Sequence, residues 1–326
     1  MSALSRRQLL AVAASGACAS LAVPARADAF PSRPIRMIVP YGAGGGSDFV
    51  GRLLAQKLTE TLGWNVVVDN KAGAAGLIGT EAAAKSAADG YTLLLADAAH
   101  ATNAAVHLKT SFDPVKDFAP LSLVGSSPQL LVAHPSVPAS TLRELLALPR
   151  ERSRELSVGT PGQGTIPHLL CETLRVKTGL DLIHVPYKGG SSALSDAVGG
   201  QIPLVINSVP ACMPHLEARR LKVLAIASPV RHPRMPNVPT FAESVPGMVG
   251  QAWYGLMAPA RTPAEVLQPL NAAIDKVLAL PEVKAKLAAA FIDPMPGGPQ
   301  AFAGYLNDEI ARWQAVVKLT GVTASS

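Results

Sequence analysis

Ile35-Arg36-Met37-Ile38-Val39 runs directly into Pro40-Tyr41-Gly42-Ala43-Gly44-Gly45-Gly46-Ser47-Asp48, and this stretch decides the fold. The first five residues predict a strand, the glycine-rich run predicts a tight turn, and a helix is expected from Phe49 onward. Glycines let backbone N–H groups turn toward a bound oxygen, and the first turn of a helix offers unpaired donors. Ser47 and Asp48 are candidate helix caps. The stretch is therefore a candidate anion-binding turn, although taken alone it also fits a plain strand–helix connection.

The same pattern of an apolar run, a turn and a helix recurs along the chain. Further strands are predicted at 66–68, 91–95, 156–158, 183–185, 204–206, 223–227 and 253–257. Short apolar runs that alternate with helical patterns are typical of a sheet covered by helices on both faces. The C-terminal helices have no sheet of their own, so we expect them to pack on the first lobe. The predicted fold class is α/β, with two α/β lobes joined by a two-crossing hinge.

The N-terminus has the features of an export signal. Arg6 and Arg7 precede an apolar run from Leu9 to Val23, and Ala25-Arg26-Ala27 fits a cleavage site. Residues 1–27 are predicted to be a signal peptide, with Sec and twin-arginine export both open. The remaining chain carries 26 basic and 23 acidic residues and no basic tract with interleaved aromatics, so we expect no nucleic-acid partner. It also has no apolar stretch long enough to span a bilayer, and we expect a soluble protein outside the cytoplasm.

The cysteines and histidines do not have the spacing of metal or cofactor ligands. Cys171 and Cys212 remain after removal of the leader. A disulfide and two buried thiols are both open, and the apolar helical pattern around Cys171 favours the thiols. His100, His168 and His184 show no His-x-x-x-His or His/Cys spacing. The sequence therefore predicts no metal site and no cofactor.

Several motifs together resemble one family. They are the opening stretch 34–48, Asp89-Gly90-Tyr91-Thr92-Leu93, Val185-Pro186-Tyr187-Lys188-Gly189-Gly190 and the tryptophan-containing C-terminal segment. In this order and spacing the chain resembles the tripartite tricarboxylate transporter substrate-binding family, also called Bug receptors, over essentially its whole mature length. The resemblance implies a periplasmic binding protein of type II-like fold, with lobe 1 formed by 28–125 and 252–326 and lobe 2 by 126–251.

The same resemblance implies the function and the partners. We expect a monomer that closes two lobes around a small organic carboxylate and feeds a membrane transporter. Delivery of the ligand signal to a membrane sensor is kept as an alternative. The carboxylate is expected to be held by backbone N–H groups and hydroxyls rather than by an arginine fork.

The family's binding loops carry over to matching positions of this chain. From lobe 1 they are Tyr41, Ala43, Gly44, Gly45, Ser47, Asp48, Gly73 and Ala74, and from lobe 2 Thr160, Gln163, Gly164, Thr165, Tyr187, Lys188, Gly189 and Asn207. Lys188 is either a solvated loop lysine or a cation aimed at the carboxylate. Asn207 stands where relatives often carry aspartate, which makes a ligand with an ammonium group less obvious.

Other functions fit the sequence less well. A dinucleotide site is disfavoured because a second glycine-rich loop follows Asp69, where the Rossmann pattern has none. An exported α/β hydrolase is the main alternative, but Ser47 lacks the Gly-x-Ser-x-Gly turn and its candidate partner His168 falls in the other lobe. We therefore expect no catalysis. Trp313 is expected in the core, and Trp253 and Tyr254 near the cleft.

Overall fold

The computed structural model describes residues 30–106, 110–149 and 156–322. The chain divides into two units, Met1–Ser32 and Arg33–Ser326, and the described helices and strands all lie in the second. The predicted signal peptide, residues 1–27, lies outside the described residues. Within the described part, no helix is long and apolar enough to cross a bilayer.

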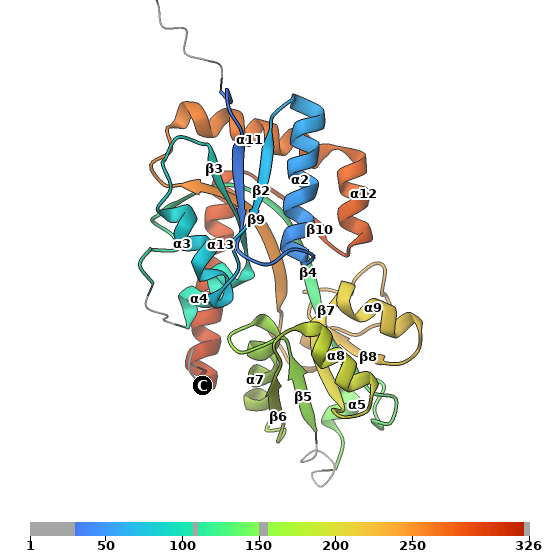
Figure 1. Ribbon diagram of the computed structural model, residues 1–326. Helices are drawn as coiled ribbons and strands as arrows, with labels where there is room; N and C mark the ends of the chain where they lie inside the picture. The colour runs from blue at the N-terminus through green and yellow to red at the C-terminus, as the bar shows by residue number, and fades with distance from the viewer. Residues whose placement is uncertain (1–29, 107–109, 150–155, 323–326) are drawn as a thin grey trace, which may run out of the picture. The chain divides into compact units, whose positions relative to one another are not determined.

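Strands and helices alternate along most of the chain (Figure 1). The strands are β1 (Ile35–Val39), β2 (Val66–Asn70), β3 (Thr92–Asp97), β4 (Phe118–Ala133), β5 (Ser157–Thr160), β6 (Ile183–Pro186), β7 (Leu204–Ser208), β8 (Lys222–Ile226), β9 (Gln251–Pro259) and β10 (Asp293–Gly297). The helices are α2 (Gly46–Leu62), the 3₁₀ helix η1 (Ala74–Gly76), α3 (Leu77–Ala84), α4 (Ala98–Ala105), α5 (Leu142–Leu146), α7 (Ile166–Thr178), α8 (Gly190–Val198), α9 (Val209–Glu217), α10 (Phe241–Ser244), α11 (Ala264–Ala279), α12 (Pro281–Ala289) and α13 (Pro299–Thr320).

The described strands form a ten-stranded sheet whose two halves meet at β4. The order is β2-β1-β3-β9-β4-β7-β5-β6, with β8 and β10 also paired to β4. Strands β1, β2 and β3 are parallel to one another, and so are β5, β6 and β7, whereas β4 and β9 are antiparallel to each other and to the neighbouring parallel strands. Helices follow the parallel strands, as expected for crossover connections. The predicted alternation of strands and helices is thus confirmed.

Strand β4 links the two halves of the sheet. Its residues up to Pro128 pair with β9, and from Gln129 onward they pair with β7 and β8. The sequence predicts neither strand β4 nor strand β10. Prolines and glycines interrupt the apolar pattern of both segments, and such residues argue against a central strand when only local sequence is considered.

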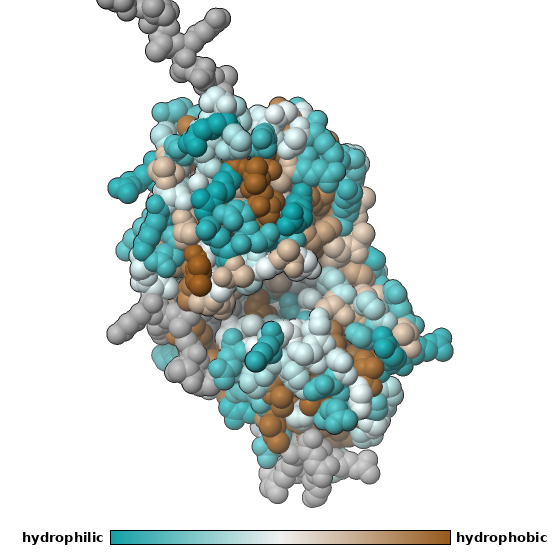
Figure 2. Space-filling view, in the orientation of Figure 1, coloured by the Kyte–Doolittle hydropathy of each residue, from teal (hydrophilic) through white to brown (hydrophobic). Residues whose placement is uncertain are grey.

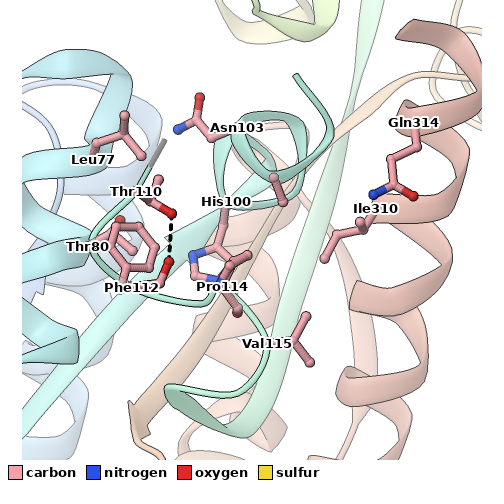
Figure 3. Close-up of a pocket in the computed structure, with 11 residues that line it drawn as sticks. Leu77, Thr80, His100, Asn103, Thr110, Phe112, Pro114, Val115, Ile310 and Gln314 are labelled. Atoms are coloured by element: carbon pink, nitrogen blue, oxygen red, sulfur yellow. Dashed lines mark hydrogen bonds between the residues drawn. The ribbon is translucent and has the colours of Figure 1, made fainter. Parts of the chain in front are cut away.

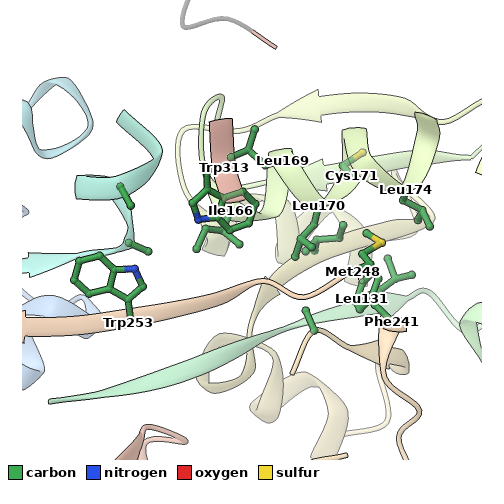
Figure 4. Close-up of a cluster of buried hydrophobic side chains, with 14 of the residues drawn as sticks. Leu131, Ile166, Leu169, Leu170, Cys171, Leu174, Phe241, Met248, Trp253 and Trp313 are labelled. Carbon is green, nitrogen blue, oxygen red and sulfur yellow. The ribbon is translucent and has the colours of Figure 1, made fainter. Parts of the chain in front are cut away.

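The C-terminal helices pack on the first half of the sheet, as predicted, and α13 also reaches the second half. Helix α11 lies against α2, while α13 contacts α4, β4 and α7. Figure 4 shows Trp313 of α13 beside Ile166 at the start of α7. Trp313 is 1% exposed, and its Nε1 donates to Glu309 Oε2 at 3.1 Å. Its predicted core position is therefore confirmed.

Three other side chains with predicted positions are buried: Cys171, Cys212 and Trp253. Cys171 and Cys212 are free and buried, which confirms the thiol interpretation, and burial raises the pKa of each thiol to about 12. The prediction that Trp253 lies near the cleft is wrong. Its ring is fully buried against Phe302 and Tyr305, because β9 is a central strand of the sheet.

Candidate ligand-binding site

The register of the sheet turns the ends of parallel strands from the two halves toward each other. Asp97 ends β3 and pairs with Tyr254 of β9, which pairs with Gly125 of β4. Four residues further along β4, Gln129 pairs with Ser208, the end of β7. Strand β3 is parallel to β4, and β7 is antiparallel to it, so the two strands end pointing toward each other. Their ends are separated by four residues of β4, which span about 13 Å when extended. The turns after β3 and β7 therefore face each other, and Figure 2 shows a hollow between the upper and lower parts of this face.

The turn after β1 presents its backbone to open space. Residues 42–46 are exposed, and a Cβ added at Gly42, Gly44 or Gly45 would meet nothing within 4 Å. Helix α2 starts after Gly45 without a side-chain cap. The N–H groups of its first turn are thus available to an anion.

Asp48 holds this turn in place. Its Oδ2 accepts hydrogen bonds from the Gly44 N–H and from Arg52 Nε, both at 2.9 Å, and its Oδ1 accepts from Asn70 Nδ2 at 2.9 Å. The hydrogen bond from Arg52 is the main reason that the pKa of the Asp48 carboxyl falls to about 2. The predicted capping role of Ser47 and Asp48 is wrong, because the helix begins at Gly46, with Gly45 in the cap position, and both side chains lie inside its first turn.

Asp97 connects the turn after β1 to the start of α4. It caps α4 by accepting the Ala99 N–H at 3.0 Å. The same oxygen, Oδ1, accepts the Tyr41 hydroxyl at 3.0 Å, and Oδ2 accepts the Ser47 hydroxyl at 3.0 Å. Burial raises the pKa of the Asp97 carboxyl to about 6, although these hydrogen bonds act in the opposite direction.

Tyr254, which the sequence predicts near the cleft, borders the same group of residues. A Cβ at Gly46 would come within 2.5 Å of its hydroxyl oxygen, so glycine is what allows α2 to approach β9 here. Burial, followed by the charge of Asp97, raises the pKa of the Tyr254 hydroxyl. Asp97 is not among the binding residues predicted from the sequence. Its position at the end of a buried apolar strand was the signal for a capping acid.

Gly73 and Ala74 lie exposed in the loop between β2 and α3. Ala74 and Ala75 have φ values of 48° and 52°, in the left-handed region that favours glycine. The Ala75 carbonyl accepts a hydrogen bond from Asn103 Nδ2 at 3.0 Å, which ties this loop to α4. Backbone strain of this kind concentrates at ligand sites, and the loop belongs to the same edge of the sheet as Asp97.

In the second half of the sheet, the turn after β5 leads into α7. Thr165 caps α7 and donates its hydroxyl to the Gly162 carbonyl at 2.7 Å. Gln163 is exposed, and the Gly164 N–H donates to His168 Nδ1 at 3.0 Å. Thr160 is fully buried and contacts His184 Nε2 at 2.8 Å. Gln163 thus lies on the outside of this turn and Gly164 has open space beside it, whereas the hydroxyls of Thr160 and Thr165 are engaged within the turn.

His168, Glu172 and His184 form a group that the sequence spacing does not reveal. Their potential metal-binding atoms lie within 4.8 Å of one another, and the two imidazole rings stack at 4.0 Å between centroids. The groups already have protein partners, however: His168 receives the Gly164 N–H, His184 contacts Thr160, and Glu172 receives two hydrogen bonds from Arg175. Burial lowers the pKa of His168 to about 4 and also lowers the pKa of His184, so burial disfavours a charge on either ring. The arrangement supports the turn after β5, and we assign it no metal.

The remaining predicted residues follow β6 and β7. Helix α8 starts after Gly189 without a side-chain cap, and Lys188 is exposed with no ion-pair partner in the described part of the chain. Tyr187 donates its hydroxyl to Asp196 Oδ2 at 2.8 Å. Asn207 is buried: its Nδ2 donates to the Gly190 carbonyl at 3.0 Å, and its Oδ1 accepts the Ser208 N–H at 2.8 Å. The side chains of Tyr187 and Asn207 therefore act within the protein.

A separate cavity of about 360 Å³ lies beside α4 and α13 (Figure 3). His100 projects into it, with Nε2 2.7 Å from the Pro114 carbonyl, and burial lowers the pKa of this imidazole. The Thr110 hydroxyl donates to the Phe112 carbonyl at 2.6 Å on its wall. None of the residues predicted to bind ligand lines this cavity. The candidate site is therefore the group of turns at the ends of the parallel strands.

Comparison with known proteins places the chain in a family. The sequence pattern of the tripartite tricarboxylate transporter family receptor matches residues 50–322. The chain is 39% identical over 308 residues to protein BugT of Bordetella pertussis, which covers 94% of each chain. It is 36% identical over 316 residues to a protein encoded in the tcbD-tcbE intergenic region of Pseudomonas sp. strain P51, covering 96% of this chain and 94% of the relative.

Solved structures show the same fold. An R. palustris protein solved with adipate superposes with a TM-score of 0.81 at 35% identity, covering 90% of this chain and 99% of the other. MatC from Rhodopseudomonas palustris with bound malate has a TM-score of 0.77 at 31% identity, covering 88% of this chain and all of the other. The predicted mixed α/β periplasmic binding protein fold is thus confirmed. Since the matched family consists of solute-binding receptors, the chain is a binding protein and not an enzyme. The chain belongs to the tripartite tricarboxylate transporter receptor family of periplasmic solute-binding proteins.

Proposed function

We propose that this protein captures a small organic carboxylate between two lobes and delivers it to a tripartite tricarboxylate-type transporter in the membrane. The observation that carries this proposal is the start of α2 after Gly45, where a glycine turn with an open backbone leads into a helix without a side-chain cap. Relatives solved with adipate and with malate support a carboxylate, and a dicarboxylate in particular, as the ligand class.

The turns of both lobes share the binding in this proposal. Backbone N–H groups of Gly45–Ser47 and of Gly189–Gly190 point at the carboxylate, and the Gln163 side chain and the Thr165 backbone N–H complete the contact from the turn after β5. A helix N-terminus contributes about 0.3–1 kcal/mol to anion binding when exposed and up to ~2 kcal/mol when partly buried. Closure of the lobes raises this contribution because it removes competing water. Tyr41, Gly73 and Lys188 border the same space in the proposal.

The lobes in this proposal are residues 28–125 with 252–326, and 126–251. The change of sheet partner along β4, between Pro128 and Gln129, supports a crossing close to 125. Gln251, the first residue of β9, pairs with Pro128 and supports the second crossing close to 252. Two crossings side by side in the sheet allow a hinge motion with small backbone changes.

Calorimetric titration with adipate and malate tests the binding function. We expect saturable binding of at least one carboxylate, and small-angle scattering should show a smaller radius of gyration with that ligand. Mass spectrometry of ligand released from denatured protein identifies the natural compound. No binding across a panel of mono-, di- and tricarboxylates would overturn the proposal.

Delivery to a transporter needs its own experiment, because a sensor subunit would bind the same ligand. We expect the ligand-loaded protein to be retained by immobilised membrane subunits of a tripartite tricarboxylate-type transporter and the empty protein to be retained less. Retention by a sensor's outer domain instead would replace transport with signalling as the biological role.

A further inference from the structure

Asp97 is a carboxylate without a cationic partner in the middle of the candidate site. Other acids of the same half are paired: Asp48 with Arg52, Asp69 with Arg36, and Asp89 with Arg33, at 2.7–2.9 Å. Across residues 30–106, 110–149 and 156–322, no lysine, arginine or histidine forms such a pair with Asp97. The site therefore carries a negative charge that the protein itself does not balance.

The hydrogen bonds of Asp97 leave room for one more donor. Its two oxygens offer about four acceptor positions, of which three are filled by the Tyr41 hydroxyl, the Ser47 hydroxyl and the Ala99 N–H. Oδ2 accepts only from Ser47. Asp97 is half-buried, so its environment strengthens a charge-assisted hydrogen bond from a bound ligand.

The same hydrogen bonds decide what Tyr41 and Ser47 offer to a ligand. Each hydroxyl has a single proton, and each donates that proton to Asp97. Toward a ligand both oxygens are then acceptors, and only the backbone N–H groups of α2 remain as donors. The turn therefore offers donors for a carboxylate beside acceptors and a negative charge for a cationic group.

We propose that Asp97 selects ligands that carry an ammonium group next to the carboxylate, that is amino acids, over unsubstituted organic acids. In this arrangement the ligand's carboxylate lies at the start of α2, and its ammonium group donates to Asp97 Oδ2 and faces the hydroxyl oxygens of Ser47 and Tyr41. The inference rests on the proposed capture of a carboxylate. It replaces the expectation, drawn from Asn207, that a ligand with an ammonium group is less obvious. The Asn207 amide is hydrogen-bonded within the second half of the sheet, and the acid that would bind the ammonium group is Asp97 at the end of β3.

Matched ligand pairs test this selectivity. Calorimetric titrations at neutral pH compare succinate with aspartate, and adipate with α-aminoadipate, so that each pair differs only in the amino group. We expect the amino acid of the better-fitting pair to bind at least about tenfold more tightly, the size expected for a hydrogen bond to a charged group. Asp97→Asn keeps a good helix cap but removes the charge, and we expect it to abolish this preference and to tighten binding of the unsubstituted acid.

Asp69→Asn is the matched control, because it removes a charge from the same half at a residue already paired with Arg36. This variant should keep the wild-type preference. Equal binding of both members of each pair by the wild-type protein, or a preference that survives in Asp97→Asn, would overturn the role of Asp97 while leaving carboxylate capture intact. Failure of all four ligands and of the wider carboxylate panel would instead overturn the proposed function itself.

Discussion

The hydroxyl of Ser47 donates a 3.0 Å hydrogen bond to Oδ2 of Asp97, which lies fifty positions later in the chain. The other oxygen of Asp97 accepts from Tyr41, so the turn after β1 and the turn after β3 form one hydrogen-bonded unit. Protonation of this single carboxyl therefore changes the charge presented at two neighbouring turns. Tyr254, Tyr41 and Ser47 face the carboxyl from the surrounding elements, and none of them carries a positive charge.

Protein stability should depend on pH through Asp97. The pKa of its carboxyl is about 6 in the folded protein and about 3.9 in an unfolded chain, so between these values the folded state binds more protons. The free energy of unfolding should therefore fall as pH rises from about 4 to about 6, by about 1–2 kcal/mol. Urea unfolding across this range measures the effect. Asp97→Asn lacks the titrating group, and the difference between the two proteins should show this slope; a difference that is constant with pH would contradict it.

An acid placed at the start of α2 should block ligand binding. Gly45 has backbone angles that any residue adopts and space for a Cβ, so Gly45→Asp fits and caps the helix with its own carboxylate. We expect affinity for a carboxylate ligand to fall roughly 30-fold, equivalent to about 2 kcal/mol. Gly298→Asp is the control: Gly298 is also an uncapped glycine before a helix, with the same free space, but it precedes α13. That variant should bind like the wild type. Unchanged affinity in Gly45→Asp would remove the α2 terminus from the site.

Removal of the Asp48 carboxylate should destabilise the protein. Asp48→Ala leaves the Gly44 N–H and the Asn70 amide without their acceptor and releases Arg52. We expect a loss of about 2–3 kcal/mol, as for hydrogen bonds to a charged group. The contribution is present above about pH 4 and is lost as pH falls toward 2, because the folded pKa is depressed. Lys85→Ala removes only an exposed pair with Glu81 and should cost less than about 0.5 kcal/mol in the same urea titrations. Equal losses in both variants would argue against a structural role for Asp48.

Two glycines near α13 should respond to alanine with opposite signs. A Cβ at Gly255 of β9 would overlap the buried ring of Phe302, so Gly255→Ala should cost about 1–3 kcal/mol. Gly304 is exposed within α13 and has nothing within 4 Å of an added Cβ, so Gly304→Ala should stabilise the protein by about 0.5–1 kcal/mol. Thermal unfolding of both variants checks the pair. A gain for Gly255→Ala would mean that Phe302 moves aside without cost.

The sequence was sufficient to predict strands, turns and helix starts wherever the pattern that identifies them lies within one short segment. Strands such as Ile35–Val39, and the glycine turn that follows it, are visible because period, glycine content and helix start lie within one short segment. The order and spacing of such segments also identified the family, and from it the exposed glycines Gly44 and Gly45 and the half-buried Gly189 as candidates for ligand contact. Long strands that contain proline, such as β4, were not predicted, because their pairing partners lie far away in the chain.

The tertiary structure alone decided how those segments work together. Tyr41 lies 56 positions and Ser47 lies 50 positions before Asp97 in the chain, yet both donate a hydrogen bond to it. Because each hydroxyl proton is used in this way, both hydroxyl oxygens can only accept from a ligand. The tertiary structure also showed Asn207 engaged within its own half of the sheet and His168 stacked on His184. The sequence thus determined that this is an α/β binding protein with glycine turns at its strand ends, since those features depend on short-range geometry. Which side chains donate, accept or remain charged at those turns depends on long-range register, and only the fold establishes it.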